Sequence, residues 1–207
     1  MPPARPGLDF ALERSLLAAG HRLVAGLDEV GRGPLAGPVV AAAVVLDPAR
    51  IPEGLADSKA LSGRQRERIT AVILESAHVG IGTASPATID ALNIRGATLR
   101  ALRRALDALP CRPDLALVDG RDLPDFPCAA KAIVRGDASV ASIAAASIVA
   151  KVVRDRMMTR LGLHLPAFGF ERNAGYPTAG HRAALLSEGP SRFHRMSFAP
   201  CRDAGEP

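Results

Sequence analysis

Cysteine is scarce in this 207-residue chain, and its three copies are far apart, at Cys111, Cys128 and Cys201. An odd number of distant cysteines does not form a disulfide framework, and the chain contains neither a CxxC nor an HExxH pattern that could bind zinc. We therefore interpret the three cysteines as reduced thiols and expect a cytoplasmic protein.

Long apolar runs are also missing. No stretch approaches the roughly 18 uninterrupted apolar residues of a membrane span, and the N-terminal sequence MPPARPGLDF has no apolar signal-peptide core. Membrane insertion and export are not expected. Because 48% of the residues are hydrophobic, a chain of this length can bury about 70% of its unfolded surface and form a core without disulfides.

Lysine is rare, because 23 of the 26 basic residues are arginine and the only lysines are Lys59, Lys131 and Lys151. Residues 1–130 hold 15 basic and 15 acidic residues, whereas residues 131–207 hold 11 and 6, which gives the net charge of +5. The C-terminal third is where a polyanion would bind, unless the excess only reflects an arginine-rich proteome. The lysines lie in or near the motifs described below, which favours a role for a compact ammonium group.

Three predicted strands each end beside a carboxylate. These strands and the acids that follow them are residues 23–27 with Asp28 and Glu29, residues 113–118 with Asp119, and residues 129–134 with Asp137. In an open α/β sheet, polar residues just past neighbouring strand ends converge on one crevice. Each acid alone would be interpreted as an ordinary turn residue. Their repetition favours a common site.

The pair Asp28 and Glu29 raises a geometric question, since neighbouring residues on a regular strand point to opposite faces. The glycines of the following turn predict that the strand ends at Asp28, so that Glu29 or its backbone carbonyl can turn toward the same place. Two such oxygen donors would suit Mg²⁺ or Mn²⁺. The alternative is a solvated Asp-Glu pair at a strand end.

Further strands are predicted at residues 39–46 and 78–84. Helices are predicted at residues 8–19, 62–75 with Ser62 as the N-cap, 86–109, 139–161 and 178–187. In the helix at 139–161, Ser147, Lys151 and Arg154 fall on one stripe, which could line a phosphate track or be only the polar flank of a buried helix.

Two further residues stand out. Lys59 lies in a polar loop, where it could reach a phosphate or be an ordinary surface lysine. Tyr176 is the only tyrosine of the chain and lies in a turn. Such a ring is either a lid on the core or a stacking platform for a sugar or base.

Seven segments together resemble the bacterial ribonuclease HII family, over residues 23–200. They are DEVGRGPLAGPVVAAAV, DSKALS, IDALNIRGAT, LVDG, RGDASVASIAAASIVAKVVRD, GYPTAGH and HRMSF, in this order. The resemblance implies an α/β chain with an RNase H-like fold, a five-stranded mixed sheet flanked by helices and followed by a C-terminal helical segment. It implies a single catalytic domain over residues 1–207, with a core at about 20–161 and a substrate-contacting segment at about 162–200.

The implied activity is endonucleolytic cleavage of RNA paired with DNA, including at a single ribonucleotide embedded in duplex DNA, which leaves a 5′-phosphate and a 3′-hydroxyl. By resemblance, two divalent ions, Mg²⁺ or Mn²⁺, would be held by Asp28, Glu29, Asp119 and Asp137. The implied substrate contacts are the turn Gly31, Arg32 and Gly33 to the ribose 2′-hydroxyl, Tyr176 to the sugar at the RNA–DNA junction, and Lys59, Ser147 and Lys151 to phosphates. Ala174 and Met196 depart from the family pattern, in which basic residues are frequent.

Three alternative functions share parts of this pattern. The spacing Gly31-x-Gly33-x-x-x-Gly37 misses a dinucleotide-binding turn by one residue, which argues against an oxidoreductase. A module that binds RNA–DNA hybrids without cutting them would fit the charge, and another two-metal nuclease of the same fold would fit the acids. We expect a monomer whose partners are RNA–DNA hybrids and DNA–RNA–DNA duplexes, with no membrane partner.

Overall fold

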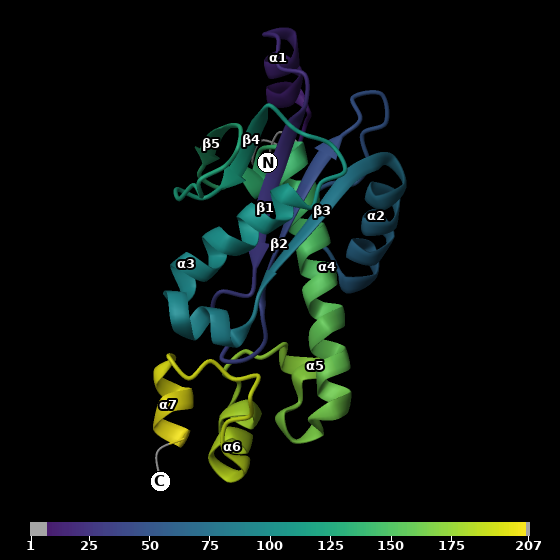
Figure 1. The fold of residues 1–207 in the computed structure, drawn as a ribbon. Coiled ribbons are helices and arrows are strands. Elements are labelled where there is room, and N and C mark those ends of the chain that lie inside the picture. Colours follow the sequence, from purple (N-terminus) through teal and green to yellow (C-terminus); the bar gives the residue numbers. More distant parts are fainter. Residues whose placement is uncertain (1–7, 206–207) are drawn as a thin grey trace, which may run out of the picture.

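The centre of the protein is a five-stranded mixed sheet, seen in a computed structural model that describes residues 8–205 (Figure 1). Residues 1–7, on which part of the signal-peptide prediction rests, lie outside the described residues, as do residues 206–207. The strands are β1 (Val24–Val30), β2 (Val39–Leu46), β3 (Ala77–Ala84), β4 (Leu115–Asp119) and β5 (Ala129–Ile133). Their order is β3-β2-β1-β4-β5, with β1 antiparallel to β2 and parallel to β4. The predicted fold class is confirmed.

Helices α1 (Ala11–Ala18), α2 (Gly63–Ser76), α3 (Pro86–Asp107) and α4 (Ala141–His164) pack against the sheet. Three further helices, α5 (Phe170–Asn173), α6 (Ala179–Glu188) and α7 (Ala199–Gly205), lie beyond its end (Figure 1). Ser62 caps α2, as expected from the sequence, and forms a reciprocal capping pair with Gln65. Helix α3 is kinked at Asn93, whose φ of 56° is left-handed. The short helices α5 and α7 were not predicted.

Alternate side chains of β2 point into two hydrophobic cores, one on each face of the sheet. Ala41 and Ala43 pack toward α3, whereas Ala42 and Val44 pack toward α2 and α4. Helix α4 lies directly on β1, because a Cβ placed on Gly26 would come within 2.2 Å of the Ser142 backbone. A strand buried on both faces reads as one continuous apolar run, which is why β2 is recognisable in the sequence.

The C-terminal segment packs against the turn that joins β1 and β2. Leu35 donates its N–H to the Gly175 carbonyl at 2.8 Å, and Gly37 donates to the Phe193 carbonyl at 2.9 Å. In Figure 1, α6 and α7 accordingly lie at the end of the molecule opposite α1. Two parts of the chain that are about 140 residues apart thus form one end of the protein. Among residues 8–205, no helix is both long and apolar enough to cross a membrane.

Candidate active site

Parallel pairing of β1 and β4 places Asp28 and Asp119 next to each other. The register pairs Leu27 with Val118, so the two acids follow at adjacent positions on neighbouring strands. The Asp119 carboxylate accepts a hydrogen bond from the Gly136 N–H at 2.7 Å. That bond holds the short 3-10 helix Gly136–Ala138, which carries Asp137, against the end of β4. The predicted convergence of three strand ends is therefore present in the fold.

The prediction that the first strand ends at Asp28 is wrong. Strand β1 continues through Glu29 to Val30, because its ladder with β2 pairs Asp28 with Ala42 and Glu29 with Ala41. The chain turns only at Gly31, whose φ is +92°. By strand alternation Asp28 faces α4 and Glu29 faces α3, so the two side chains begin on opposite faces of the sheet.

Burial, and after it the charge of neighbouring acids, raises the pKa values of Asp28, Glu29 and Asp137. Burial is the largest cause for Asp28, whose pKa is well above its usual value, and the charge of Glu29 is the next. Burial also raises the pKa of Glu29, against the opposing effect of Arg32, and that of Asp137. The charge of Asp119 contributes to all three increases. A cation bound among these groups would offset both the cost of burying their negative charges and the repulsion between them.

The donor set fits a hard divalent cation, because carboxylate oxygens are the ligands that Mg²⁺ and Mn²⁺ prefer. As the side chains stand, no three His, Cys, Asp or Glu residues within 8–205 form a ready group of metal ligands. Two features account for this. Asp28 and Glu29 leave β1 on opposite faces, and Asp137 lies 3.9 Å from the Lys59 ammonium. Side-chain rotation would be needed to bring the four carboxylates onto shared ions.

Lys59 and Ser147 adjoin the acids. The Lys59 side chain is 84% exposed beside Asp137, so its ammonium is accessible to a ligand. Ser147 on α4 is buried, interacts with Asp28 and shares a 3.0 Å hydrogen bond with Ser58. This bond fixes the loop that carries Lys59 to the helix beneath the acids.

The predicted polar stripe of α4 is only partly correct. Lys151 is partly exposed and pairs with Asp155 at 2.8 Å. Arg154, in contrast, is fully buried and cannot line a phosphate track. The turn after β1 and the C-terminal segment cover it. Its guanidinium donates to the carbonyl oxygens of Ala36, Pro38 and Ala174, at 3.2, 3.0 and 3.0 Å respectively.

A second buried arginine, Arg195, holds the turn that contains Gly31, Arg32 and Gly33. It donates to the carbonyl oxygens of Gly31 at 2.5 Å, Arg32 at 2.8 Å and Gly37 at 2.9 Å. Burial lowers the pKa of Arg195 to about 9, and the charge of Arg154 adds to the effect. The sequence does not predict a role for Arg195, although the residue lies in the HRMSF segment, because nothing in the local pattern indicates that it is buried.

Tyr176 lies beside this turn. A Cβ placed on Gly33 would lie 3.7 Å from Cε1 of the Tyr176 ring, so the ring is close to the glycine. The Tyr176 side chain is 43% exposed, which favours a stacking platform over a lid on the core. Its backbone is fixed by a left-handed Ala174 and by the hydrogen bond that the Leu35 N–H donates to the Gly175 carbonyl.

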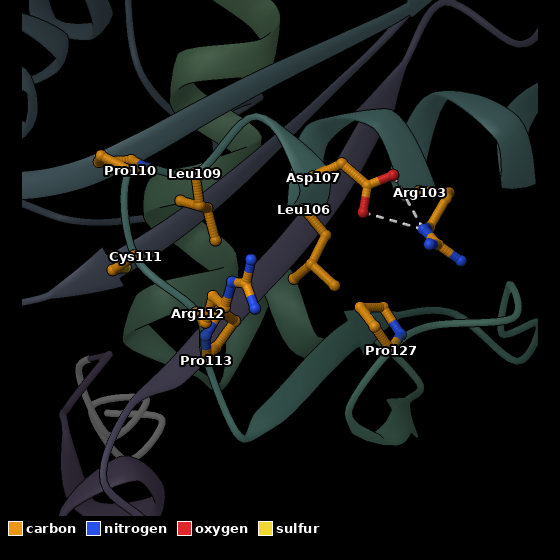
Figure 2. Close-up of a pocket in the computed structure, with 9 residues that line it drawn as sticks. All are labelled: Arg103, Leu106, Asp107, Leu109, Pro110, Cys111, Arg112, Pro113 and Pro127. Carbon is orange, nitrogen blue, oxygen red and sulfur yellow. Dashed lines mark hydrogen bonds and ion pairs between the residues drawn. The ribbon is translucent and has the colours of Figure 1, made fainter.

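Two hollows flank α3. One of about 120 Å³ lies at the acids and is lined in part by Glu29, Asp119, Arg32 and Arg95. Figure 2 shows the other, of about 570 Å³, lined by Arg103, Leu106, Asp107, Leu109, Pro110, Cys111, Arg112, Pro113 and Pro127. Its Arg103 is already engaged by Asp107 at 2.9 Å. None of the predicted site residues lines the second hollow, whereas Glu29, Arg32 and Asp119 line the first.

Known proteins resemble this chain over most of its length. The ribonuclease HII family model matches residues 25–201. Ribonuclease HII of Xanthobacter autotrophicus is 60% identical over 197 residues, which cover 95% of this chain and 79% of that protein. The crystal structure of ribonuclease H2 from Pyrococcus horikoshii superposes with a TM-score of 0.74 at 26% identity, covering 89% of this chain and 97% of that one.

A further structure, Bst-RNase HIII in complex with Mn²⁺, has a TM-score of 0.69 at 21% identity, covering 99% of this chain and 75% of that one, and shows the same fold. Family, sequence identity and fold thus agree over nearly the whole chain. The chain belongs to the ribonuclease HII family and is a ribonuclease H, an endonuclease that acts on RNA–DNA hybrids.

Proposed function

We propose that this ribonuclease H also incises DNA duplexes at single embedded ribonucleotides, with two divalent ions held by Asp28, Glu29, Asp119 and Asp137. One observation carries the proposal: the acids, the glycine turn after β1 and the exposed Tyr176 ring lie at one end of the sheet. The turn and the ring could select a ribose beside DNA while the acids serve the reaction.

The chemistry explains the need for several acids. Bound divalent ions would lower the pKa of the attacking water and neutralise charge on the leaving oxygen. Asp28 and Asp119, adjacent on parallel strands, would hold ions at the sheet edge. Asp137 would add a ligand when its pairing with Lys59 is released to a phosphate. Cleavage would leave a 5′-phosphate and a 3′-hydroxyl.

The turn formed by Gly31, Arg32 and Gly33 would recognise the ribose. Within the described residues, the N–H groups of Arg32 and Gly33 donate to no protein acceptor, whereas the carbonyls of Gly31 and Arg32 are held by Arg195. The amides are therefore available to a ligand while the opposite edge of the turn is fixed. A 2′-hydroxyl, which distinguishes RNA from DNA, is a suitable acceptor.

Tyr176 would select the junction. Its half-exposed ring next to Gly33 could stack on the sugar that follows the ribonucleotide. Stacking on an aromatic ring contributes about 1–3 kcal/mol for a base. Lys59, Ser147 and Lys151 would contact phosphates, and the net charge of +5 favours a polyanion. We expect a monomer in the cytoplasm, where free cysteines such as Cys111 stay reduced.

A non-catalytic hybrid-binding module accounts less well for the site. Its four clustered acids would repel the phosphates of a bound strand unless a metal ion neutralised them. A nuclease specific for DNA would have no use for free amides placed to contact a 2′-hydroxyl.

The proposal is tested by cleavage of three duplexes: DNA with one ribonucleotide, a continuous RNA–DNA hybrid, and all-DNA. Each is incubated with Mg²⁺ or Mn²⁺ and with EDTA. We expect metal-dependent incision on the 5′ side of the lone ribonucleotide, and no cleavage of DNA. If only the hybrid is cut, the role of Tyr176 at the junction is wrong, and if all-DNA is cut, the role of the turn is wrong.

A further inference from the structure

Two histidines, His181 and His194, lie buried side by side behind the turn that carries Tyr176. Their exposed fractions are 0% and 2%, and their Nε2 atoms are 3.0 Å apart. The rings of Phe168 and Phe170 pack against them, with centroids 4.7 Å from His194 and 5.3 Å from His181 respectively. No carboxylate bonds to either ring among residues 8–205.

The hydrogen bonds determine where each proton lies. The backbone N–H of Ser191 can only donate, and it is 2.9 Å from Nδ1 of His194. His194 therefore carries its proton on Nε2 and donates it to Nε2 of His181. His181 must then carry its own proton on Nδ1, which is 2.9 Å from the carbonyl oxygen of Tyr176. One fixed donor thus sets both tautomers.

We propose that His181 and His194 are positioning residues that orient the Tyr176 turn for the RNA–DNA junction. The chain of hydrogen bonds from Ser191 through His194 and His181 to the Tyr176 carbonyl is called the relay here. It connects the C-terminal loop to the ring that is proposed to face the substrate. Burial also lowers the pKa of His194 to about 4, which keeps His194 neutral near pH 7. The inference rests on the proposed role of Tyr176.

The hydrogen bond from His181 gives the Tyr176 turn a contact with residues outside the turn. The Tyr176 carbonyl also accepts the Thr178 N–H at 2.8 Å, and the Tyr176 N–H donates to Asn173 at 2.9 Å. Both of these contacts lie within the turn and move with it. Only the His181 contact ties this carbonyl to the aromatic cluster behind it, so its loss would let the ring shift relative to Gly33.

Two substitutions of His181 separate the relay from simple packing. In His181→Asn, the amide nitrogen can occupy the place of Nδ1 and still donate to Tyr176. In His181→Gln, the amide oxygen can occupy the place of Nε2 and accept from His194, but the bond to Tyr176 is lost. We expect kcat/KM on a single-ribonucleotide duplex to fall by about tenfold to a hundredfold in His181→Gln and much less in His181→Asn. His164→Gln, at an exposed histidine, is the control.

The decisive measurement is a double-mutant cycle with Tyr176→Ala, with thermal unfolding recorded for each variant. We expect His181→Gln to have no further effect in the Tyr176→Ala background, because the misplaced ring is already absent. Equal losses in both backgrounds, or equal losses for the Asn and Gln variants, would refute the relay. If Tyr176→Ala alone leaves junction cleavage unchanged, the proposed role of Tyr176 itself fails, which is a separate result.

Discussion

Arg195 and Arg32 are 163 residues apart, yet the Arg195 guanidinium donates to the Arg32 carbonyl at 2.8 Å. The same side chain also holds Gly31 and Gly37 and is fully buried. Burying a cation without a carboxylate partner is costly. In this protein it fixes the carbonyl edge of the proposed ribose-reading turn, so that the opposite, amide edge keeps its geometry.

Replacing Arg195 with Gln should destabilise the protein and weaken the turn. The carbonyls of Gly31, Arg32 and Gly37 would lose their donors, and each buried polar group left unpaired costs about 1–3 kcal/mol. We expect a decrease of about 2–4 kcal/mol in the free energy of unfolding by urea. Arg202→Gln, at a side chain that is 56% exposed, should change stability little. Equal values for the two variants would refute the role of Arg195.

A methyl group on Gly33 should separate folding from function. The added Cβ would be in ordinary contact with Tyr176 at 3.7 Å and would therefore be tolerated by the fold. It would occupy space between the turn and the ring, where we place the ribose. We expect Gly33→Ala to keep its melting temperature within a few degrees and to lose at least about tenfold in ribonucleotide cleavage.

Gly180→Ala is the matched control for Gly33→Ala, because a Cβ on Gly180 meets nothing within 4 Å. Since Gly180 lies in α6, alanine should stabilise the helix by about 0.5–1 kcal/mol and leave cleavage unchanged. Full activity of Gly33→Ala would show that ribose does not approach the turn closely.

Asp28→Asn should abolish cleavage and yet stabilise the protein in EDTA. Burial raises the Asp28 pKa well above its unfolded value, so above that folded pKa the ionised group opposes folding. Removing the charge should therefore raise the free energy of unfolding at pH 8. Mn²⁺ should raise the melting temperature of the natural protein more than that of the variant. A folded, active Asp28→Asn protein would exclude Asp28 from the site.

Acid should destabilise the protein through His194. Its pKa is lowered to about 4 in the fold, first by burial and then by His181, from about 6.5 in the unfolded chain. Between these values the unfolded state binds the proton and the folded state does not, so stability falls as the pH drops from about 6.5 toward about 4. Urea unfolding at several pH values should show this slope, and His194→Gln should reduce it. An identical slope in the variant would assign the effect to other groups.

The sequence predicted the sheet well because its signals are local. The apolar run of β2, the Ser62 cap and the acids after the strands each depend on neighbouring residues, and parallel order then brings Asp28 and Asp119 together. The end of β1 was predicted too early. The last residues of β1 stay in the sheet because they pair with β2, and the glycines of the turn do not indicate how far this pairing extends.

The support behind the site was not predictable in the same way. Arg154 falls on the polar stripe of α4 by periodicity, but segments from elsewhere in the chain bury it. Likewise, His181 and His194 meet only because the C-terminal segment folds back on itself. Segments that are distant in the sequence bury these residues, and a local sequence pattern does not indicate such contacts.

The claim that the acids hold divalent ions is tested most directly by crystals of the enzyme soaked in Mn²⁺, with anomalous difference maps. We predict peaks within about 2.0–2.6 Å of carboxylate oxygens of Asp28 and Asp119, with Glu29 and Asp137 turned toward them. An Asp28→Asn crystal should lose at least one peak. Absence of any peak at Asp28 and Asp119 in the natural protein at millimolar Mn²⁺ would contradict the account.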